Sequence, residues 1–201
     1  MSSPLIQRRY TPEEYLALER EAEYKSEYIN GHIFAMAGAS EAHNLITANV
    51  AGEMRSQFKG RPCKVYSSDM RVKVSRTGMY TYPDVVAVCG EARVEDDHQD
   101  TLLNPTVIIE VLSPSTEAYD RGDKFAHYRR LESVQEYVLI AQDKVRVDHY
   151  VKQGKKWVLT EFSEINDTVP LASVGCNLAL REIYDKVEFP PEPEPKHPTL
   201  T

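Results

Sequence analysis

The sequence predicts an α+β fold in which a central mixed sheet is flanked by helices. Two short runs rich in β-branched residues, VVAV at 85–88 and TVIIEVL at 106–112, are apolar on both faces. This is typical of strands in a sheet that is covered on both sides. Helical spacing of apolar residues indicates helices at 12–22, 41–58 and 117–131. With 201 residues and 41% apolar content, the chain is long enough for one domain with its own core.

The first helix is predicted from the signals at its N-terminus. Thr11 stands at N-cap, Pro12 at N1 and Glu14 at N3, which together form a capping box. The helix is expected to run to about Ala22 and to serve packing rather than chemistry. Its apolar side carries Tyr15, Leu16 and Leu18. Residues 1–10 are expected to be loosely ordered.

A β-hairpin is predicted in the segment SEYINGHIFAMAG at 26–38. Apolar and polar residues alternate on both sides of Asn30-Gly31, a pair that favours a type I′ turn. Glu27 lies three residues before this turn. Its carboxylate is either directed toward a functional site or exposed to solvent on the strand.

Ser40 is expected to cap a second helix that runs from about Glu41 to Phe58. Its buried side is an i, i+4 ladder formed by Ile46, Val50, Met54 and Phe58. His43 lies three residues before Ile46, at the start of the helix and on its buried side. It could donate to a phosphate, helped by the helix N-terminus, or it could be a satisfied packing histidine.

One strand, with a bulge at SSD, is predicted over 62–74 because polar and apolar residues alternate there. Three basic residues lie at the end of this strand and just after it: Arg71, Lys73 and Arg76. They could contact a phosphate backbone, although a solvated sheet edge is the default interpretation. The loop 90–104, which contains EDDHQD, is expected to be exposed and acidic. His98 stands beside Asp96 and Asp97, a pattern that could bind a metal, but a flexible loop is a poor place for a metal site.

Each of the two apolar strands carries one carboxylate, Asp84 and Glu110. Burying an unpaired carboxylate costs several kcal/mol, roughly, unless a cation or hydrogen-bond donors satisfy it. If the strands are neighbours, both acids can hold one divalent ion, and Mg²⁺ prefers one or two carboxylates with waters and phosphate oxygens. The alternative is that Asp84 is a turn residue and that Glu110 pairs with a basic neighbour.

A helix is predicted to begin near Glu117, after SPST. Lys124, Tyr128 and Leu131 share one face of it, with Phe125 beside them. A lysine on the sheet-facing side must reach solvent or lie near a negative group, for which Glu110 is the candidate. Such a lysine could orient water or stabilise phosphate charge in a transition state. The alternative is a simple lysine–glutamate pair.

These residues resemble the PD-(D/E)XK restriction-endonuclease-like superfamily, and more narrowly the Uma-type family of restriction endonucleases, over roughly residues 10–185. PD at 83–84 alone is a weak motif, whereas EVLSPST followed by D, K and Y at this spacing is more specific. The segments that carry the resemblance are EYINGHI at 27–33, His43 opening a helix, YPDVVAV at 82–88, IIEVLSPST ending at Thr116, DKFAHYRRL at 123–131 and EYVLI at 136–140.

The resemblance implies an αβββαβ core at about 41–141 and a metal-dependent endonuclease that hydrolyses phosphodiester bonds, with DNA as the expected substrate. Mg²⁺ or Mn²⁺ would be held by Asp84 and Glu110, and Lys124 would position water or stabilise charge. Glu27 would be an accessory ligand or water-orienting group, with His43 of the same rank. In the superfamily the lysine follows the acid by two residues, where this chain has Leu112. The Uma-type pattern has the lysine on the following helix, which matches Lys124.

The remainder of the chain is expected to complete a single domain over 1–188. A buried strand is predicted at 134–140, a hairpin around Gly154 at 144–162, and a short helix near Leu180. Trp157 in the hairpin is expected to pack or to form an interface. The Pro- and Glu-rich tail, 189–201, is expected to be disordered.

The net charge of −7 argues against binding nucleic acid by charge alone. Cys63, Cys89 and Cys176 are widely spaced with no CxxC, which favours reduced thiols and a cytoplasmic location. The sequence shows no apolar stretch long enough to span a bilayer and no signal peptide, so no membrane partner is expected. A homodimer is expected.

Two other function classes stay open. A non-catalytic binding module on a nuclease-like scaffold would fit the acidic composition, and it would also fit the presence of Leu112 where the superfamily has its lysine. A dimeric assembly protein could use the Trp157 hairpin. The motifs of P-loop, dinucleotide-binding, GxSxG hydrolase and HExxH zinc proteins are missing from the sequence, which argues against those chemistries.

Overall fold

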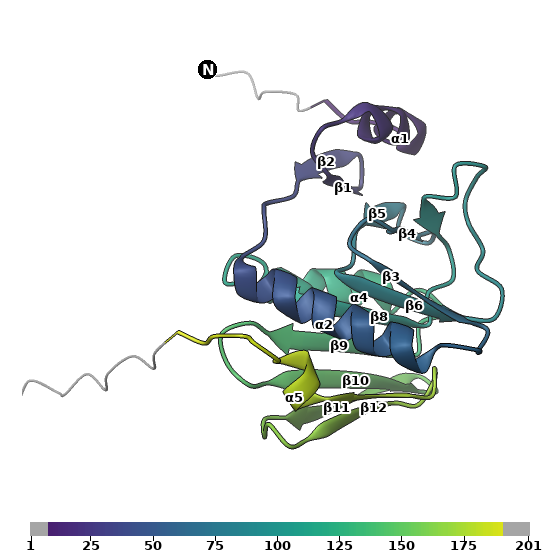
Figure 1. Ribbon diagram of the computed structural model, residues 1–201. Coiled ribbons are helices and arrows are strands. Elements are labelled where there is room, and N and C mark those ends of the chain that lie inside the picture. The colour runs from purple at the N-terminus through teal and green to yellow at the C-terminus, as the bar shows by residue number, and fades with distance from the viewer. Residues whose placement is uncertain (1–7, 191–201) are drawn as a thin grey trace, which may run out of the picture.

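The computed structural model describes residues 8–190 and confirms the predicted α+β fold with a central mixed sheet (Figure 1). This sheet has six strands in the order β11-β10-β9-β8-β6-β3. Only β8 and β9 pair in parallel, and the other neighbours are antiparallel. The strands are β3 (Cys63–Ser67), β6 (Val85–Cys89), β8 (Val107–Leu112), β9 (Glu136–Ala141), β10 (Val147–Gln153) and β11 (Lys156–Phe162).

Helices cover both faces of this sheet. On one face, α2 (Glu41–Gln57) packs against side chains of β6 and β8 such as Val85 and Ile109. On the other face, Val86 and Ile108 pack against a helical segment that follows β8. That segment consists of α3 (Glu117–Tyr119), a π-helical turn η1 (Asp120–Lys124) and α4 (Phe125–Tyr128). Figure 1 shows α2 in front of the sheet and α4 behind it. The order α2, β3, β6, β8, α4, β9 is the predicted αβββαβ core.

A second sheet of five strands lies against the N-terminal helix, in the order β2-β1-β5-β4-β7. Its core is formed by tyrosines, with Tyr15 of the helix packed against Tyr28 and Tyr80 of the sheet. The elements are α1 (Pro12–Glu21), β1 (Ser26–Ile29), β2 (His32–Ala35), β4 (Arg71–Val74), β5 (Met79–Thr81) and β7 (Thr101–Leu102). The C-terminal part adds β12 (Thr168–Leu171), β13 (Cys176–Ala179) and α5 (Leu180–Ile183).

The local predictions at the N-terminus are confirmed. Thr11 and Glu14 form the capping box of α1. Asn30 and Gly31 both have positive φ, 52° and 90°, as the two-residue turn of the β1–β2 hairpin requires. The apolar side of α1 is corrected at one position, because Leu18 is 52% exposed while Glu19 is buried. Glu19 is satisfied there by hydrogen bonds from Ser26 and Tyr82.

The single strand predicted over 62–74 is wrong. The chain turns at the SSD segment, and the two halves join different sheets: β3 pairs with β6, and β4 pairs with β5 and β7. Backbone hydrogen bonds from Asp69 and Met70 to the Ser67 carbonyl form the turn. Alternation in the sequence shows that a residue run is extended, but it does not show which partner strand each half meets.

The default interpretation of a solvated basic edge is also wrong for Arg71. This side chain is buried, with its guanidinium 2.6 Å from Asp100 and 3.1 Å from the Tyr82 hydroxyl. The segment 90–104, predicted as an exposed acidic loop, is buried where Thr101 and Leu102 form β7, and its acids supply partners to other cations as well. Asp96 and Asp100 bind Arg20 of α1, and Lys73 pairs with Glu95 in the same loop. The loop therefore fastens α1 to the five-stranded sheet.

The expectation of three reduced thiols is corrected by a disulfide between Cys63 and Cys89, while Cys176 is a buried free thiol. The two cysteines are directly opposite each other on antiparallel β3 and β6. A closed loop of this length stabilises a fold by about 3 kcal/mol. Sequence spacing did not indicate the pairing, because it depends on strand register.

The C-terminal hairpin around Gly154 is confirmed, and Trp157 packs edge-on against Phe125 with ring centroids 5.3 Å apart. At the end of the described chain, the Phe189 ring contacts Tyr184. The predicted loose start and most of the predicted tail, residues 1–7 and 191–201, lie outside the described residues. The single domain over 1–188 stays a prediction. Among residues 8–190, none of the helices is long and apolar enough to cross a membrane.

Candidate active site

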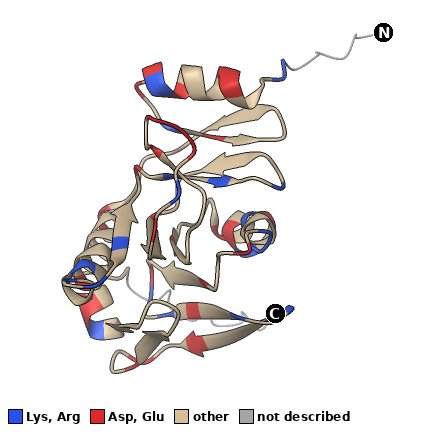
Figure 2. Ribbon diagram, turned by 90° about the vertical axis from the view of Figure 1, so that its right-hand side faces the viewer, with Lys and Arg blue, Asp and Glu red and all other residues tan. Residues whose placement is uncertain are grey.

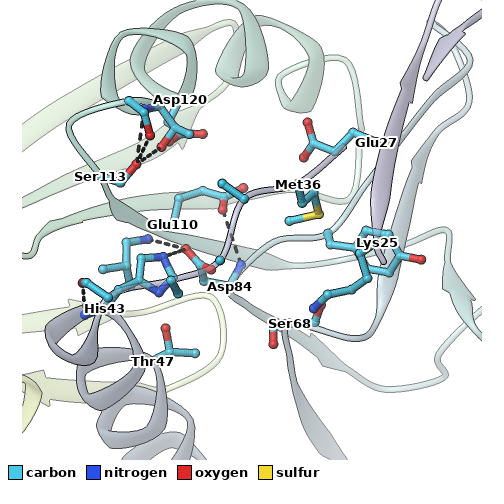
Figure 3. Close-up of a pocket in the computed structure, with 18 of the residues that line it drawn as sticks. Lys25, Glu27, Met36, His43, Thr47, Ser68, Asp84, Glu110, Ser113 and Asp120 are labelled. Carbon is cyan, nitrogen blue, oxygen red and sulfur yellow. Dashed lines mark hydrogen bonds and ion pairs between the residues drawn. The ribbon is translucent and has the colours of Figure 1, made fainter. Parts of the chain in front are cut away.

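A cavity of about 790 Å³ lies where the β1–β2 hairpin approaches the six-stranded sheet. All five residues predicted for the site line it: Glu27, His43, Asp84, Glu110 and Lys124. Figure 3 shows Asp84 and Glu110 side by side, with His43 approaching from α2 and Glu27 from the hairpin. The fold therefore brings together five segments that are far apart in the sequence.

Asp84 and Glu110 are neighbours because β6 and β8 pair antiparallel, with Val85 opposite Ile109. The register places Asp84, just before β6, beside Glu110. The backbone N–H of Asp84 lies 3.4 Å from Glu110 Oε2, and the N–H of Val111 donates to Asp84 Oδ2 at 2.7 Å. The two acid-bearing segments are therefore neighbours, as a divalent ion shared by Asp84 and Glu110 would require.

Glu110 is deeply buried, with 3% of its surface exposed. Its Oε1 accepts a hydrogen bond from the Tyr128 hydroxyl at 2.9 Å and lies 3.1 Å from Lys124 Nζ. The other oxygen, Oε2, faces the Asp84 backbone. The carboxylate is thus held in one orientation between the sheet and the helical segment, as a metal ligand requires.

Lys124 lies at the centre of three carboxylates. Its Nζ is 3.1 Å from Glu110, 3.2 Å from Glu27 and 3.6 Å from Asp120. The side chain is buried on the face shared with Tyr128, as predicted. The alternative of a simple lysine–glutamate pair is wrong, because the ammonium contacts carboxylates from three segments of the chain.

Asp120 is the site residue that the sequence analysis missed. It is buried and lines the cavity four residues before Lys124. The spacing itself was a usable signal, because residues i and i+4 share a helical face. Both lie in the π-helical turn η1, and single π-helical turns occur frequently at functional sites.

Glu27 is buried on β1, so the solvent-facing alternative is wrong. Its carboxylate accepts a hydrogen bond from Thr81 and contacts Lys124. It reaches the cavity from the five-stranded sheet, whereas Asp84 and Glu110 belong to the six-stranded sheet. Glu27 therefore joins the two sheets through the ammonium group of Lys124.

His43 is directed at Asp84. Its Nε2 lies 3.2 Å from Asp84 Oδ2, and its backbone N–H is capped by Ser40 at 3.1 Å. The buried Nδ1 has no hydrogen-bond partner among the described residues. Neither the phosphate-donor nor the packing alternative included this contact, in which the imidazole faces a site carboxylate from the first turn of α2.

The electrostatics of the site follow from many acids around one cation. Burial raises the pKa of Glu110 to about 8, and Asp120, Asp84 and Glu27 add to this rise against the opposing effect of Lys124. Burial also raises the pKa of Asp120. Burial alone would lower the pKa of Lys124, but Glu110, Glu27 and Asp120 raise it well above its usual value. Lys124 is therefore charged, and the cavity still has an excess of acid.

The pKa of Glu110 predicts that the metal-free fold loses stability as pH rises. Glu110 has a pKa of about 8 when folded, against 4.5 as its ordinary value. Between these pH values the folded chain keeps a proton that the unfolded chain has released, so the free energy of unfolding falls from pH 5 to pH 8. Urea unfolding in EDTA at four pH values measures this. The decline should be shallower in Glu110→Gln, and parallel curves for the two proteins would contradict the assignment.

The donor chemistry fits a hard divalent cation. Asp84 and Glu110 supply neighbouring carboxylates at the cavity, and Mg²⁺ typically takes one or two carboxylates and completes its coordination with water and phosphate oxygens. Within residues 8–190, no group of three or more His, Cys, Asp or Glu is arranged to hold an ion by itself. A site of this kind would therefore depend on non-protein ligands for most of its coordination.

Comparisons with known proteins agree with this architecture. The Uma2 family, described as "Putative restriction endonuclease", matches residues 12–181. Two proteins of Synechocystis sp., both called uncharacterized, are similar in sequence. One is 41% identical over 152 residues, which are 75% of this chain and 86% of that protein. The other is 34% identical over 184 residues, 90% and 94% of the two chains.

The fold is also similar to that of solved structures. One of them is a crystal structure of "a putative nuclease belonging to DUF820" from Anabaena variabilis, with a TM-score of 0.72. The match covers 87% of this chain and 97% of the other at 23% identity. At that identity, the likeness establishes the fold.

Proposed function

This chain belongs to the Uma2 family of restriction-endonuclease-like proteins, and on that premise we propose that it is a metal-dependent endonuclease that hydrolyses phosphodiester bonds in DNA. The observation that supports the proposal most directly is the convergence of Asp84, Glu110 and Lys124 in one cavity. The buried carboxylate of Glu110, beside the partly buried Asp84 and the buried Lys124, is costly for the fold, and packing alone does not account for it.

Asp84 and Glu110 are the residues that would hold Mg²⁺ or Mn²⁺. Such an ion lowers the pKa of a bound water and neutralises phosphate charge. Glu110 is positioned by Tyr128, and Asp84 by the Val111 N–H and by His43. These contacts keep both carboxylates aimed at one place, which reduces the reorganisation needed when substrate binds.

Lys124 would stabilise negative charge on the phosphate or orient the attacking water. The position two residues after Glu110 is occupied by Leu112, which is buried in the apolar core with Phe125 and Tyr137. The ammonium reaches Glu110 from the helical segment instead, at 3.1 Å. This geometry supports the replacement of the strand lysine by Lys124.

The direct test is a cleavage assay on single-stranded DNA, double-stranded DNA and RNA with Mg²⁺, Mn²⁺ or EDTA. We expect cleavage of DNA with either ion and none with EDTA. Cleavage of RNA alone would contradict DNA as the substrate. The absence of cleavage in every combination would contradict the proposal that the chain is an endonuclease.

The second candidate is a non-catalytic binding module. It is favoured by the ion contacts of Lys124, which already provide a counter-charge to Glu27, Glu110 and Asp120. Calorimetric titration with Mn²⁺ separates the two candidates. An enzyme should take up the ion through Asp84 and Glu110 and lose this uptake in Asp84→Asn, whereas a binding module on this scaffold need not bind the ion.

Homodimer formation through the C-terminal hairpin is part of this proposal. Val158 and Leu159 are exposed on β11, at the edge of the six-stranded sheet. Light scattering after size exclusion measures the mass directly. A monomer at micromolar concentration would remove the dimer from the proposal without affecting the chemistry of the cavity.

A further inference from the structure

The cavity has an aromatic wall as well as an acidic floor. Tyr24 is 79% exposed and Phe34 is 53% exposed, and both line the cavity that contains Asp84 and Glu110. Neither ring belongs to the tyrosine core beneath α1 or to the other two apolar clusters of the described chain. Large aromatic side chains left in solvent at the mouth of a polar cavity indicate a ligand with a flat, apolar face.

Strand register places Phe34 close to the reacting groups. On β2 it is directly opposite Glu27 of β1, and side chains of such a pair lie on the same face about 5 Å apart. Glu27 in turn contacts Lys124. The backbone N–H of Met36 donates to the Lys25 carbonyl at 2.9 Å, which holds the hairpin beyond its last paired strand residues. Figure 3 shows Met36 and Glu27 on the same side of the cavity, across from Asp84.

The charges around the cavity are unsuited to gripping a duplex by its phosphates. Five carboxylates line it, against the two lysines Lys25 and Lys124. Lys25 donates hydrogen bonds to the Ser68 carbonyl and to Asp69. Lys124 pairs with its three carboxylates. Figure 2 shows Lys and Arg interspersed with Asp and Glu along the described ribbon. Double-stranded DNA is usually held by several cations along its backbone. The carboxylates are Glu23, Glu27, Asp84, Glu110 and Asp120.

We propose that Phe34 is a stacking platform for an unpaired base of the substrate, with Tyr24 as a second aromatic surface. The substrate is then single-stranded or locally unpaired DNA, since a base inside a duplex has no free face to offer. Base–aromatic stacking works with any sequence, because every base has a flat π-face. The cavity, at about 790 Å³, lies within the range of small-ligand sites and is large enough for a nucleotide. This inference rests on the proposed function and narrows its substrate class.

The test is a binding measurement that does not depend on cleavage. A labelled 12-nucleotide single strand carrying one 2-aminopurine, and the matching duplex, are titrated with the full chain in EDTA and in Ca²⁺. We expect the single strand to bind at least about tenfold more tightly than the duplex, and its 2-aminopurine fluorescence to be quenched by stacking. Phe34→Ala should weaken single-strand binding roughly tenfold, a value within the range for one stacked base, and should abolish the quenching.

Two variants control for other effects of the substitution. Phe34→Trp keeps an aromatic face and should retain both binding and quenching. Leu18→Ala removes an equally exposed apolar side chain on α1, outside the cavity, and should bind like the wild type. Circular dichroism and light scattering on each variant show whether its fold and mass are unchanged.

Three outcomes would overturn the inference: equal binding of duplex and single strand with no effect of Phe34→Ala, no binding of either form, or a change of mass in Phe34→Ala that accounts for its lost binding. The last would make this wall an interface between copies of the chain. Stacking without any Mg²⁺- or Mn²⁺-dependent cleavage would leave this inference standing and remove the proposed function. Metal-dependent cleavage of duplex DNA that is unchanged in Phe34→Ala would support the proposed function and contradict the stacking inference.

Discussion

Asp84→Asn should remove metal-dependent cleavage while leaving the fold intact. The substitution keeps the shape of the side chain and an oxygen that can accept from the Val111 N–H. It removes the negative charge that the ion requires, and with it several kcal/mol of transition-state stabilisation, so the rate should fall roughly a thousandfold or more. The measurement is cleavage of DNA under single-turnover conditions with Mn²⁺.

Stability should change little in Asp84→Asn, by about 1 kcal/mol, because one charge-assisted hydrogen bond is exchanged for a neutral one. Asp185→Asn is the matched control, since its carboxylate is exposed and distant from the cavity lining. Control and wild type should cleave equally. If Asp84→Asn retains wild-type cleavage, Asp84 is not a metal ligand and the proposed centre is wrong.

Lys124→Met should destabilise the fold by about 3–5 kcal/mol, the usual cost of leaving a buried ion pair without one partner. Three carboxylates lose their common cation in this variant: Glu27, Glu110 and Asp120. Methionine fills a similar volume, so the loss reflects charge more than packing. Chemical unfolding in EDTA measures the change, and cleavage should be lost with it.

The same variant distinguishes a metal centre from a purely structural ion-pair cluster. If a divalent ion binds among these acids, Mn²⁺ should restore part of the lost stability, because it supplies the missing positive charge. Adding Asp120→Asn to Lys124→Met should also restore part of it, by removing one uncompensated carboxylate. Lys64→Met, at an exposed position on β3, is the control and should be neutral. A Lys124→Met protein as stable and active as the wild type would contradict both roles of the lysine.

How far the site could be predicted differs from residue to residue. Glu110 could be identified because a carboxylate inside a buried apolar strand conflicts with its surroundings, and such conflicts mark functional positions. Asp84 could be identified because it opens the other apolar run, directly after Pro83. Lys124 followed from its place on a sheet-facing helical stripe. A place for Glu27 at the site was expected only from family resemblance, and its contact with Lys124 was not predicted, since nothing near Glu27 in the sequence shows which sheet β1 joins. Asp120 was missed although it lies on the same helical face as Lys124.

Predictions of the fold were limited in the same way. Most of the longer extended segments were correctly located, but β5, β7, β12 and β13 were not predicted, and outside the two hairpins the partner of each strand was not identified. The run over 62–74 was treated as one strand, whereas the chain leaves one sheet and enters another at Ser67. The buried position of Arg71 and the disulfide between Cys63 and Cys89 follow from those pairings. Each depends on contacts between residues that are distant in the sequence.

By itself, the sequence determined the capped helix at Thr11, the Asn30-Gly31 turn, the amphipathic ladder of α2 and the two acid-bearing strands. These features depend on backbone preferences and side chains within a few residues of each other, so they are visible without a partner. Only the tertiary structure decided that Lys124 binds three carboxylates, that His43 is directed at Asp84, and that Glu27 and Phe34 line the same cavity as Asp84. These contacts join segments that are far apart in the sequence, so they form only when the two sheets pack together.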